Sequence, residues 1–132
     1  MKELIDRKLN YGRHHIRRFL EDAGPFERVL DLGAGFGDDL EIARSLRPTA
    51  QLHAIENWPD YVVGLRSRGV TVHDRDIERD ALPFQDGELD VVVMNQVMEH
   101  LKDIFWVLHE SSRTLRVGGR LILGVPNLAS LH

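Results

Sequence analysis

Apolar residues along the chain follow two alternating patterns, one with helical spacing and one of short unbroken runs. Helical spacing covers residues 4–20, 38–46, 59–68 and 101–115. Short apolar runs typical of strands cover residues 26–32, 51–56, 70–73, 89–94 and 121–125. Because strands alternate with helices, we predict a parallel, doubly wound sheet with helices on both faces. The unbroken apolar run at residues 91–94 is typical of a strand that is covered on both faces.

Capping and turn residues suggest where these elements begin and end. Asp38, followed three residues later by Glu41, is typical of a helix N-cap with its reciprocal partner. Gly118 and Gly119 are expected to end the last helix before the fifth strand. We therefore predict one three-layer α/β/α, Rossmann-like domain over residues 1–132. It has a leading helix within residues 1–24 and a core of about five parallel strands over residues 26–127.

The composition is that of an ordinary globular domain and excludes several kinds of chemistry. The 132 residues are 42% hydrophobic and 29% charged. They include no cysteine, which excludes disulfides, thiolate metal sites and thiol nucleophiles. The seven histidines show no metal-ligand spacing. No apolar run is long enough to span a membrane and acids lie near the N-terminus, so we expect a cytoplasmic protein.

Charge is divided unevenly along the chain. Residues 1–20 carry six basic and two acidic residues, which gives this segment a charge of +4. The remaining residues carry a charge of −8, so that the net charge is −4. Such an acidic body is not expected to bind nucleic acid broadly. A solvated helix face explains the basic segment better than an anion site does.

Glycines and polar residues gather where the predicted strands end, which is where parallel sheets bind ligands. The first strand runs into glycines at positions 33, 35 and 37, and such a turn lets backbone amides approach a ligand closely. The turn lacks the lysine of a phosphate-binding P-loop, which argues against nucleoside triphosphate hydrolysis. Glu56 ends the second strand, where a carboxylate can accept hydrogen bonds from two ribose hydroxyls, although a solvated acid would explain it equally well alone.

Two further strand ends add to this pattern. Asp76 follows the third strand and could accept from an adenine amino group with Ile77 beside the ring, although a polar loop also explains this acid. Asn95 and Gln96 follow the fourth strand. The coincidence of four such strand ends at one sheet edge is more specific than any one of them.

Taken in order, these segments resemble the successive motifs of class I S-adenosylmethionine-dependent methyltransferases. The resemblance covers residues 26–127 and rests on residues 29–37 (VLDLGAGFG), Glu56, residues 76–77, residues 82–84, residues 89–92, residues 99–101 and residues 115–121. It is greatest to the broad small-molecule type. It implies S-adenosylmethionine as cofactor, S-adenosylhomocysteine as product and methyl transfer to a small-molecule acceptor that the sequence does not identify.

The resemblance also implies which residues bind the cofactor. They are Asp31, Gly33, Ala34, Gly35, Gly37, Glu56, Asn57, Asp76, Ile77, Asn95 and Gln96. Asp31 and the glycines would contact the methionine part, Glu56 the ribose, and Asp76 with Ile77 the adenine. Asn95 and Gln96 would lie beside the sulfonium. The basic leading helix could cover the cofactor, with Tyr11, His14 or Arg17 near its carboxylate.

Because the sulfonium is already an activated leaving group, the main requirement is to align a nucleophile, and a general base is optional. His100, His14 and His15 are the candidate bases, and support of the following helix is the favoured role of His100. His53 is interpreted as a residue at the edge of the core. Two alternatives stay open: a catalytically idle cofactor-binding or scaffold domain, and a nicotinamide-dependent oxidoreductase or epimerase. The glycine spacing and the lack of a Tyr-x-x-x-Lys pair disfavour the second.

The sequence departs from the family pattern at two places. The stretch of residues 76–82 is longer than the commonest version, so the resemblance assigns the adenine-contacting residues only to within one or two positions. The family's sheet normally has seven strands, whereas this sequence ends soon after the fifth, as in a natural minimal version or a fragment of a longer protein. Residues 121–125 would then form an uncovered apolar edge, which suggests self-association, for example as a homodimer.

Overall fold

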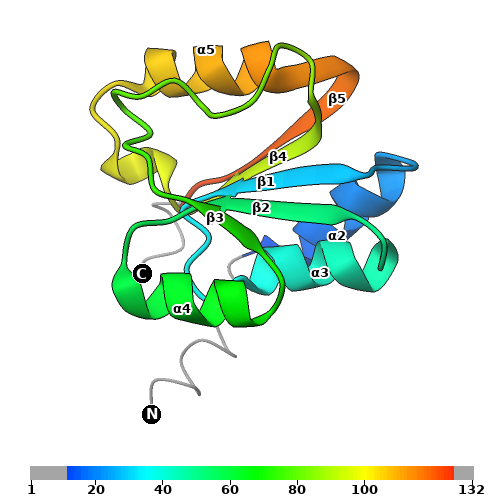
Figure 1. Ribbon diagram of the computed structural model, residues 1–132. Coiled ribbons are helices and arrows are strands. Elements are labelled where there is room, and N and C mark those ends of the chain that lie inside the picture. The colour runs from blue at the N-terminus through cyan, green and yellow to red at the C-terminus, as the bar shows by residue number, and fades with distance from the viewer. Residues whose placement is uncertain (1–11, 127–132) are drawn as a thin grey trace.

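The computed structural model describes residues 12–126 and contains one sheet between two layers of helix (Figure 1). In chain order, the elements are α2 (Arg13–Asp22), β1 (Arg28–Leu32), α3 (Asp38–Leu46), β2 (Gln51–Ile55), α4 (Pro59–Ser67), β3 (Thr71–His73), β4 (Leu89–Asn95), the short 3₁₀ helix η2 (Met98–His100), α5 (Ile104–Thr114) and β5 (Leu115–Gly124). The predicted leading helix is described only from Arg13 onward, and residues 4–11 lie outside the described part of the chain.

The five strands form a parallel sheet in the order β3-β2-β1-β4-β5. Helices α2, α3 and α4 cover one face, and α5 covers the other (Figure 1). This arrangement confirms the predicted three-layer α/β/α fold. The strand order reverses between β1 and β4, so the crevice beyond the ends of these two strands is where such folds bind ligands.

Side chains on alternate positions of the central strands pack into two cores. Val29 of β1 packs with α2 and α3 on one face, whereas Leu30 packs with α5 on the other. In β4, residues 91–94 are all buried, as predicted for a strand covered on both sides. The ends of β1 and β4 are therefore held firmly by packing on both faces of the sheet.

The boundary between α5 and β5 differs from the prediction. The helix begins at Ile104, where Asp103 Oδ1 accepts a hydrogen bond from the Trp106 amide at 3.0 Å, and it ends at Thr114. The predicted helix over residues 101–115 was therefore too long, and the strand predicted over residues 121–125 begins at Leu115.

The glycines expected to stop the helix instead lie within an irregular part of β5. Leu115 pairs with Leu89 and Arg120 with Val91, so residues 116–119 bulge out of the ladder. Gly118 has a φ of 81°, and a Cβ on Gly119 would lie 3.0 Å from the Asp90 carbonyl oxygen. Positive φ and close backbone approach both favour glycine, in a strand bulge as in a helix stop.

The start of α3 also differs from the prediction. Its N-cap is Gly37, with a φ of 84°, rather than Asp38, which is the first helical residue. The Glu41 carboxylate, expected to complete a capping box, instead lies 2.9 Å from Arg44 Nη1. The acids of the first turn still carry charge that a helix N-terminus favours.

Candidate functional site

The glycine turn after β1 lies directly against the end of β2. The Gly33 amide donates to the Ile55 carbonyl at 2.9 Å, and the Gly35 amide donates to Glu56 Oε2 at 3.0 Å. The other carboxylate oxygen of Glu56 accepts from the amides of Asn57 and Trp58 at 3.2 and 3.1 Å. A carboxylate has about four acceptor positions, so Glu56 retains capacity for a ligand.

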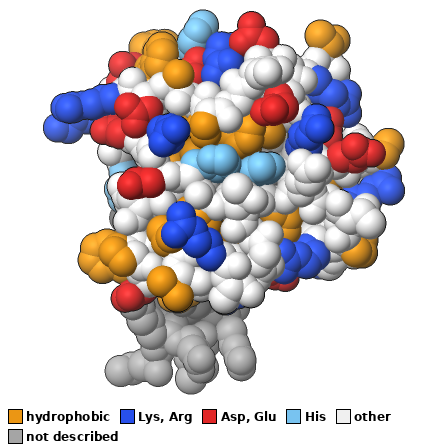
Figure 2. All heavy atoms as spheres, in the orientation of Figure 1, with side chains coloured by type: hydrophobic (Ala, Val, Ile, Leu, Met, Phe, Trp, Pro, Cys, Tyr) orange, Lys and Arg blue, Asp and Glu red, His pale blue; other side chains and the backbone are white. Residues whose placement is uncertain are grey.

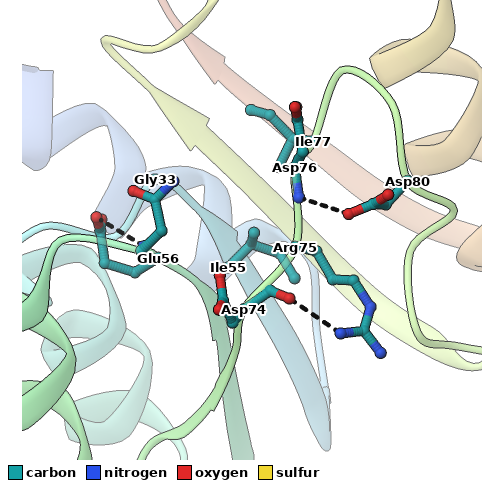
Figure 3. Close-up of a pocket in the computed structure, with 9 residues that line it drawn as sticks. Gly33, Ile55, Glu56, Asp74, Arg75, Asp76, Ile77 and Asp80 are labelled. Carbon is teal, nitrogen blue, oxygen red and sulfur yellow. Dashed lines mark hydrogen bonds between the residues drawn. The ribbon is translucent and has the colours of Figure 1, made fainter.

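A cavity of about 490 Å³ opens beyond these strand ends (Figure 3). It is lined by Gly33, Ile55, Glu56, Asn57, Asp74, Arg75, Asp76, Ile77 and Asp80. Glu56 and Gly33 lie on one side of it, and Asp76 and Ile77 lie on the other. The Asp76 amide donates to Asp80 Oδ2 at 2.8 Å, so residues 76–80, which form the wall opposite Glu56, are closed into a tight turn. The structure thus brings together the residues that follow β1, β2 and β3.

A second cavity, of about 170 Å³, lies on the other side of the glycine turn. It is lined by Arg13, Gly33, Ala34, Gly35, Phe36, Asp38, Asp39, Asn95 and Gln96. Gly33 lines both cavities, so the two form a bipartite site at the switch point of the sheet. Gly35 has a φ of 56°, and a Cβ added there would meet no atom within 4 Å, so its missing side chain leaves open space. A ligand can therefore approach the backbone of this turn closely.

Asp31 is a buried acid that lines neither cavity but lies close enough to Asp39 and Glu56 to interact with their charges. It is 2% exposed, and its Oδ2 has no hydrogen-bond partner among the described residues. Burial raises the pKa of Asp31 well above its ordinary value, and the nearby charges of Asp39 and Glu56 raise it further. A buried polar atom without a partner is costly, so such a group is a candidate for ligand contact.

Asp39 is a second buried acid, in the first turn of α3. It is 8% exposed, and Asn95 Nδ2 donates to its Oδ2 at 3.3 Å. Arg13 of α2 lies 3.5 Å from Asp39 and 3.4 Å from Asp38. Burial raises the pKa of Asp39, whereas the hydrogen bond from Asn95 and the charge of Arg13 lower it. The small cavity is therefore an acidic site with one arginine at its edge.

Arg13 and Asp39 were not among the residues predicted from the sequence to bind the cofactor. The signals available were the basic leading segment and the acids that follow the glycine turn. Of the three residues suggested for the carboxylate, Tyr11 lies outside the described residues and His14 is exposed. Arg17 is hydrogen-bonded to Ser45 Oγ at 3.2 Å and does not line the small cavity.

Gln96 has an unusual backbone conformation at the end of β4. Its φ of 59° is the only positive value for a non-glycine residue in the described part of the chain. Its amide donates to the Gly124 carbonyl at 2.8 Å, which ties the turn to the end of β5. A Cβ on Gly124 would collide with the Asn95 side chain. Backbone strain of this kind is concentrated at binding and catalytic sites.

None of the candidate bases His100, His14 and His15 lines either cavity. The His100 side chain is 77% exposed, 3.7 Å from Glu99, and lines neither cavity. His53 Nδ1 lies 3.2 Å from His73 Nε2, and both rings contact Phe84. Burial lowers the pKa of His53 and of His73. Figure 2 shows adjacent histidines near the middle of the visible face, beside hydrophobic side chains.

Residues 12–126 contain neither a candidate metal site nor a membrane-spanning helix. These residues contain no group of three or more histidine, cysteine or acidic side chains that could hold a metal ion. Within the same range, no helix is long and apolar enough to cross a membrane.

Comparison with known proteins gives a family match and several relatives. The family described as methionine biosynthesis protein MetW matches residues 13–131. A demethylmenaquinone methyltransferase of Thermus thermophilus is 30% identical over 131 residues, which is 92% of this chain and 59% of the relative. A bifunctional methionine biosynthesis protein MetXA/MetW of Rhodopirellula baltica is 31% identical over 108 residues, which is 76% of this chain and 17% of the relative. The chain thus spans less than two thirds of either relative.

Solved structures share the fold. The S-adenosylmethionine-bound amino pentose methyltransferase CalS10 of Micromonospora echinaspora has a TM-score of 0.72 at 23% identity, with 89% of this chain and 51% of that chain covered. An arsenic(III) S-adenosylmethionine methyltransferase of Chlamydomonas reinhardtii has a TM-score of 0.64 at 27% identity, with 75% and 40% covered. The shared region is thus about half of the first chain and two fifths of the second.

Proposed function

Because the chain belongs to the MetW family, within the class I S-adenosylmethionine-dependent methyltransferases, we propose that its bipartite site binds S-adenosylmethionine and serves methyl transfer to a small-molecule acceptor. The observation that carries the proposal is the hydrogen bond from the Gly35 amide to Glu56. This contact joins the glycine turn and the strand-end acid in one site, with a cavity on either side of Gly33.

The larger cavity has the residues to hold the adenosine half. Glu56 would accept hydrogen bonds from the ribose hydroxyls, next to Asn57. Asp76 and Ile77, on the opposite wall, would contact the adenine. The glycine turn provides backbone amides without side chains in the way.

The smaller cavity suits the methionine half on electrostatic grounds. Its ammonium group would supply a partner for the buried acids Asp31 and Asp39, each of which has its pKa raised mainly by burial. Arg13, at the edge of this cavity, would pair with the carboxylate. An acidic site with one arginine thus matches a group that carries both charges.

The bound cofactor supplies a methyl group on a positively charged sulfur. This chain's own task would be to hold that end of the site in one geometry and to orient the acceptor. Asn95 and Gln96 line the small cavity at the end of β4, and their positions are fixed by Asp39 and by the Gly124 carbonyl. Their amides can orient a polar acceptor by hydrogen bonding.

Calorimetry tests this proposal. We expect S-adenosylmethionine and S-adenosylhomocysteine to bind, and Glu56→Ala to weaken both about tenfold or more, since contacts to a charged acceptor contribute about 1.5–3 kcal/mol. Glu21→Ala, at an exposed position on α2, is the matched control. Absence of binding to either compound, or equal binding by the Glu56→Ala variant, would contradict the proposal. A methyl-transfer assay with the full-length gene product then separates an enzyme from an idle binding domain.

A further inference from the structure

The wall of the larger cavity formed by residues 76–80 is fastened to the segment that precedes α5. Glu78 Oε2 accepts hydrogen bonds from the amides of Lys102 and Asp103, each at 2.8 Å. The Glu78 amide in turn donates to Asp76 Oδ1 at 2.9 Å. One carboxylate oxygen therefore joins two segments that are more than twenty residues apart in the sequence.

Two neighbouring contacts reinforce this connection. The Trp106 indole Nε1 donates to the Asp80 carbonyl at 3.3 Å. Asp103, whose amide binds Glu78, also caps α5 by accepting from the Trp106 amide. The cavity wall is thereby attached to the start of a helix whose Val107 is buried in the core.

Glu78 itself lines neither cavity, whereas its neighbours Ile77 and Asp80 both line the larger one. The two amide hydrogen bonds lower the pKa of Glu78, so that it is ionised at neutral pH. A charged acceptor makes stronger hydrogen bonds to amides than a neutral one does. Without contacting a ligand, Glu78 can therefore affect its binding through the position of residues 76–80.

We propose that Glu78 is a positioning residue, which holds the adenine-side wall of the site against the start of α5. This inference rests on the proposed function, because it takes the ligand of this cavity to be an adenosine group. Formation of the Glu78 contact and binding of the ligand are coupled reciprocally: if the contact favours ligand binding, bound ligand favours the contact. If only the fastened wall binds adenosine, ligand at one hundred times its Kd suppresses opening of this contact about 100-fold.

Hydrogen exchange and calorimetry on the same samples test the inference. S-adenosylhomocysteine and 5′-methylthioadenosine are expected to slow exchange of the Lys102 and Asp103 amides by up to about 100-fold. Glu78→Ala is expected to weaken both ligands about tenfold, within the usual range of coupling energies. Glu78→Gln should bind with an affinity between those of Glu78→Ala and the wild type, because glutamine retains the oxygen that accepts from both amides but lacks its charge.

The outcomes separate this inference from the proposed function. If the wild type binds neither ligand, the proposed function fails and this inference fails with it. If the wild type binds both, but Glu78→Ala binds them equally well, only the positioning role is wrong. If Glu78→Ala does not fold, hydrogen exchange of the wild type decides. Exchange rates of the Lys102 and Asp103 amides that do not change when ligand is bound would overturn the inference. Glu21→Ala serves again as the control for a lost exposed carboxylate.

Discussion

Replacement of Asp31 by asparagine is expected to stabilise the ligand-free protein while it impairs cofactor binding. The side chain is 2% exposed, and its Oδ2 has no partner among the described residues. Asparagine has nearly the same shape but carries no charge, so the variant removes electrostatic repulsion without opening a cavity. Stability and binding should therefore move in opposite directions.

The size and the pH dependence of the stability change follow from burial. Each pKa unit by which the native state exceeds the unfolded state costs about 1.4 kcal/mol of stability at a pH above both pKa values, and asparagine, which does not ionise, avoids this cost. Because the pKa of Asp31 is raised well above its ordinary value, we expect Asp31→Asn to raise the free energy of unfolding by about 1 kcal/mol or more at neutral pH. For a chain of this length, this is roughly 4 °C in Tm per kcal/mol. Because burial raises the native pKa of Asp31, the native state binds its proton more tightly than the unfolded state does. Wild-type stability therefore falls as pH rises from about 4 through the raised native pKa, and the advantage of the variant shrinks toward acidic pH.

Thermal unfolding from pH 4 to pH 8 and calorimetry with S-adenosylhomocysteine measure the two effects. Loss of a charged partner for the ligand's ammonium is expected to weaken binding about tenfold or more. Asp22→Asn, at an exposed position on α2, is the control and should change neither quantity. A variant that is less stable than the wild type at neutral pH and binds the ligand equally well would refute the role given to Asp31.

Three further predictions concern other parts of the chain. Gln96→Gly removes the strain of a φ of 59°, so a denaturant titration should show a gain in stability of up to about 1 kcal/mol. The same variant is expected to transfer methyl groups more slowly. Unchanged activity would show that the Gln96 side chain is not needed. Arg113→Ala leaves the carboxylate of Glu110, which is 3% exposed, without its ion pair, and should cost about 3 kcal/mol in the same titration, whereas a loss below 1 kcal/mol would contradict this. The β5 edge, where Leu123 is 41% exposed, should mediate self-association that Leu123→Lys abolishes in light scattering; a wild type that stays monomeric at high concentration would rule this out.

Much of the fold could be predicted from local patterns, because the central strands are buried on both faces. The apolar run at residues 91–94 has this cause and was correctly predicted as part of a strand. Glycines were harder to interpret. Gly118 and Gly119 serve a bulge within β5, and Gly37 takes the N-cap position expected for Asp38. A glycine signals an unusual backbone conformation, but the signal does not say which element contains it.

The candidate site was predictable where it follows strand ends and was missed where it depends on packing between helices. Glu56 and Asp76 follow β2 and β3, and a parallel sheet brings such ends to one edge. Arg13 reaches Asp39 only because α2 packs beside α3 on the same face of the sheet. Glu78 likewise acquires its partners, Lys102 among them, from a segment more than twenty residues away. No local pattern contains these contacts.

A crystal structure of the chain with S-adenosylhomocysteine bound would test most directly whether the bipartite site holds the cofactor. We expect the ribose hydroxyls on the Glu56 carboxylate, the adenine between Ile77 and Asp76, and the ammonium group beside Asp31. Density for the ligand in another part of the molecule, or a Glu56 side chain turned away from the ribose, would contradict this expectation.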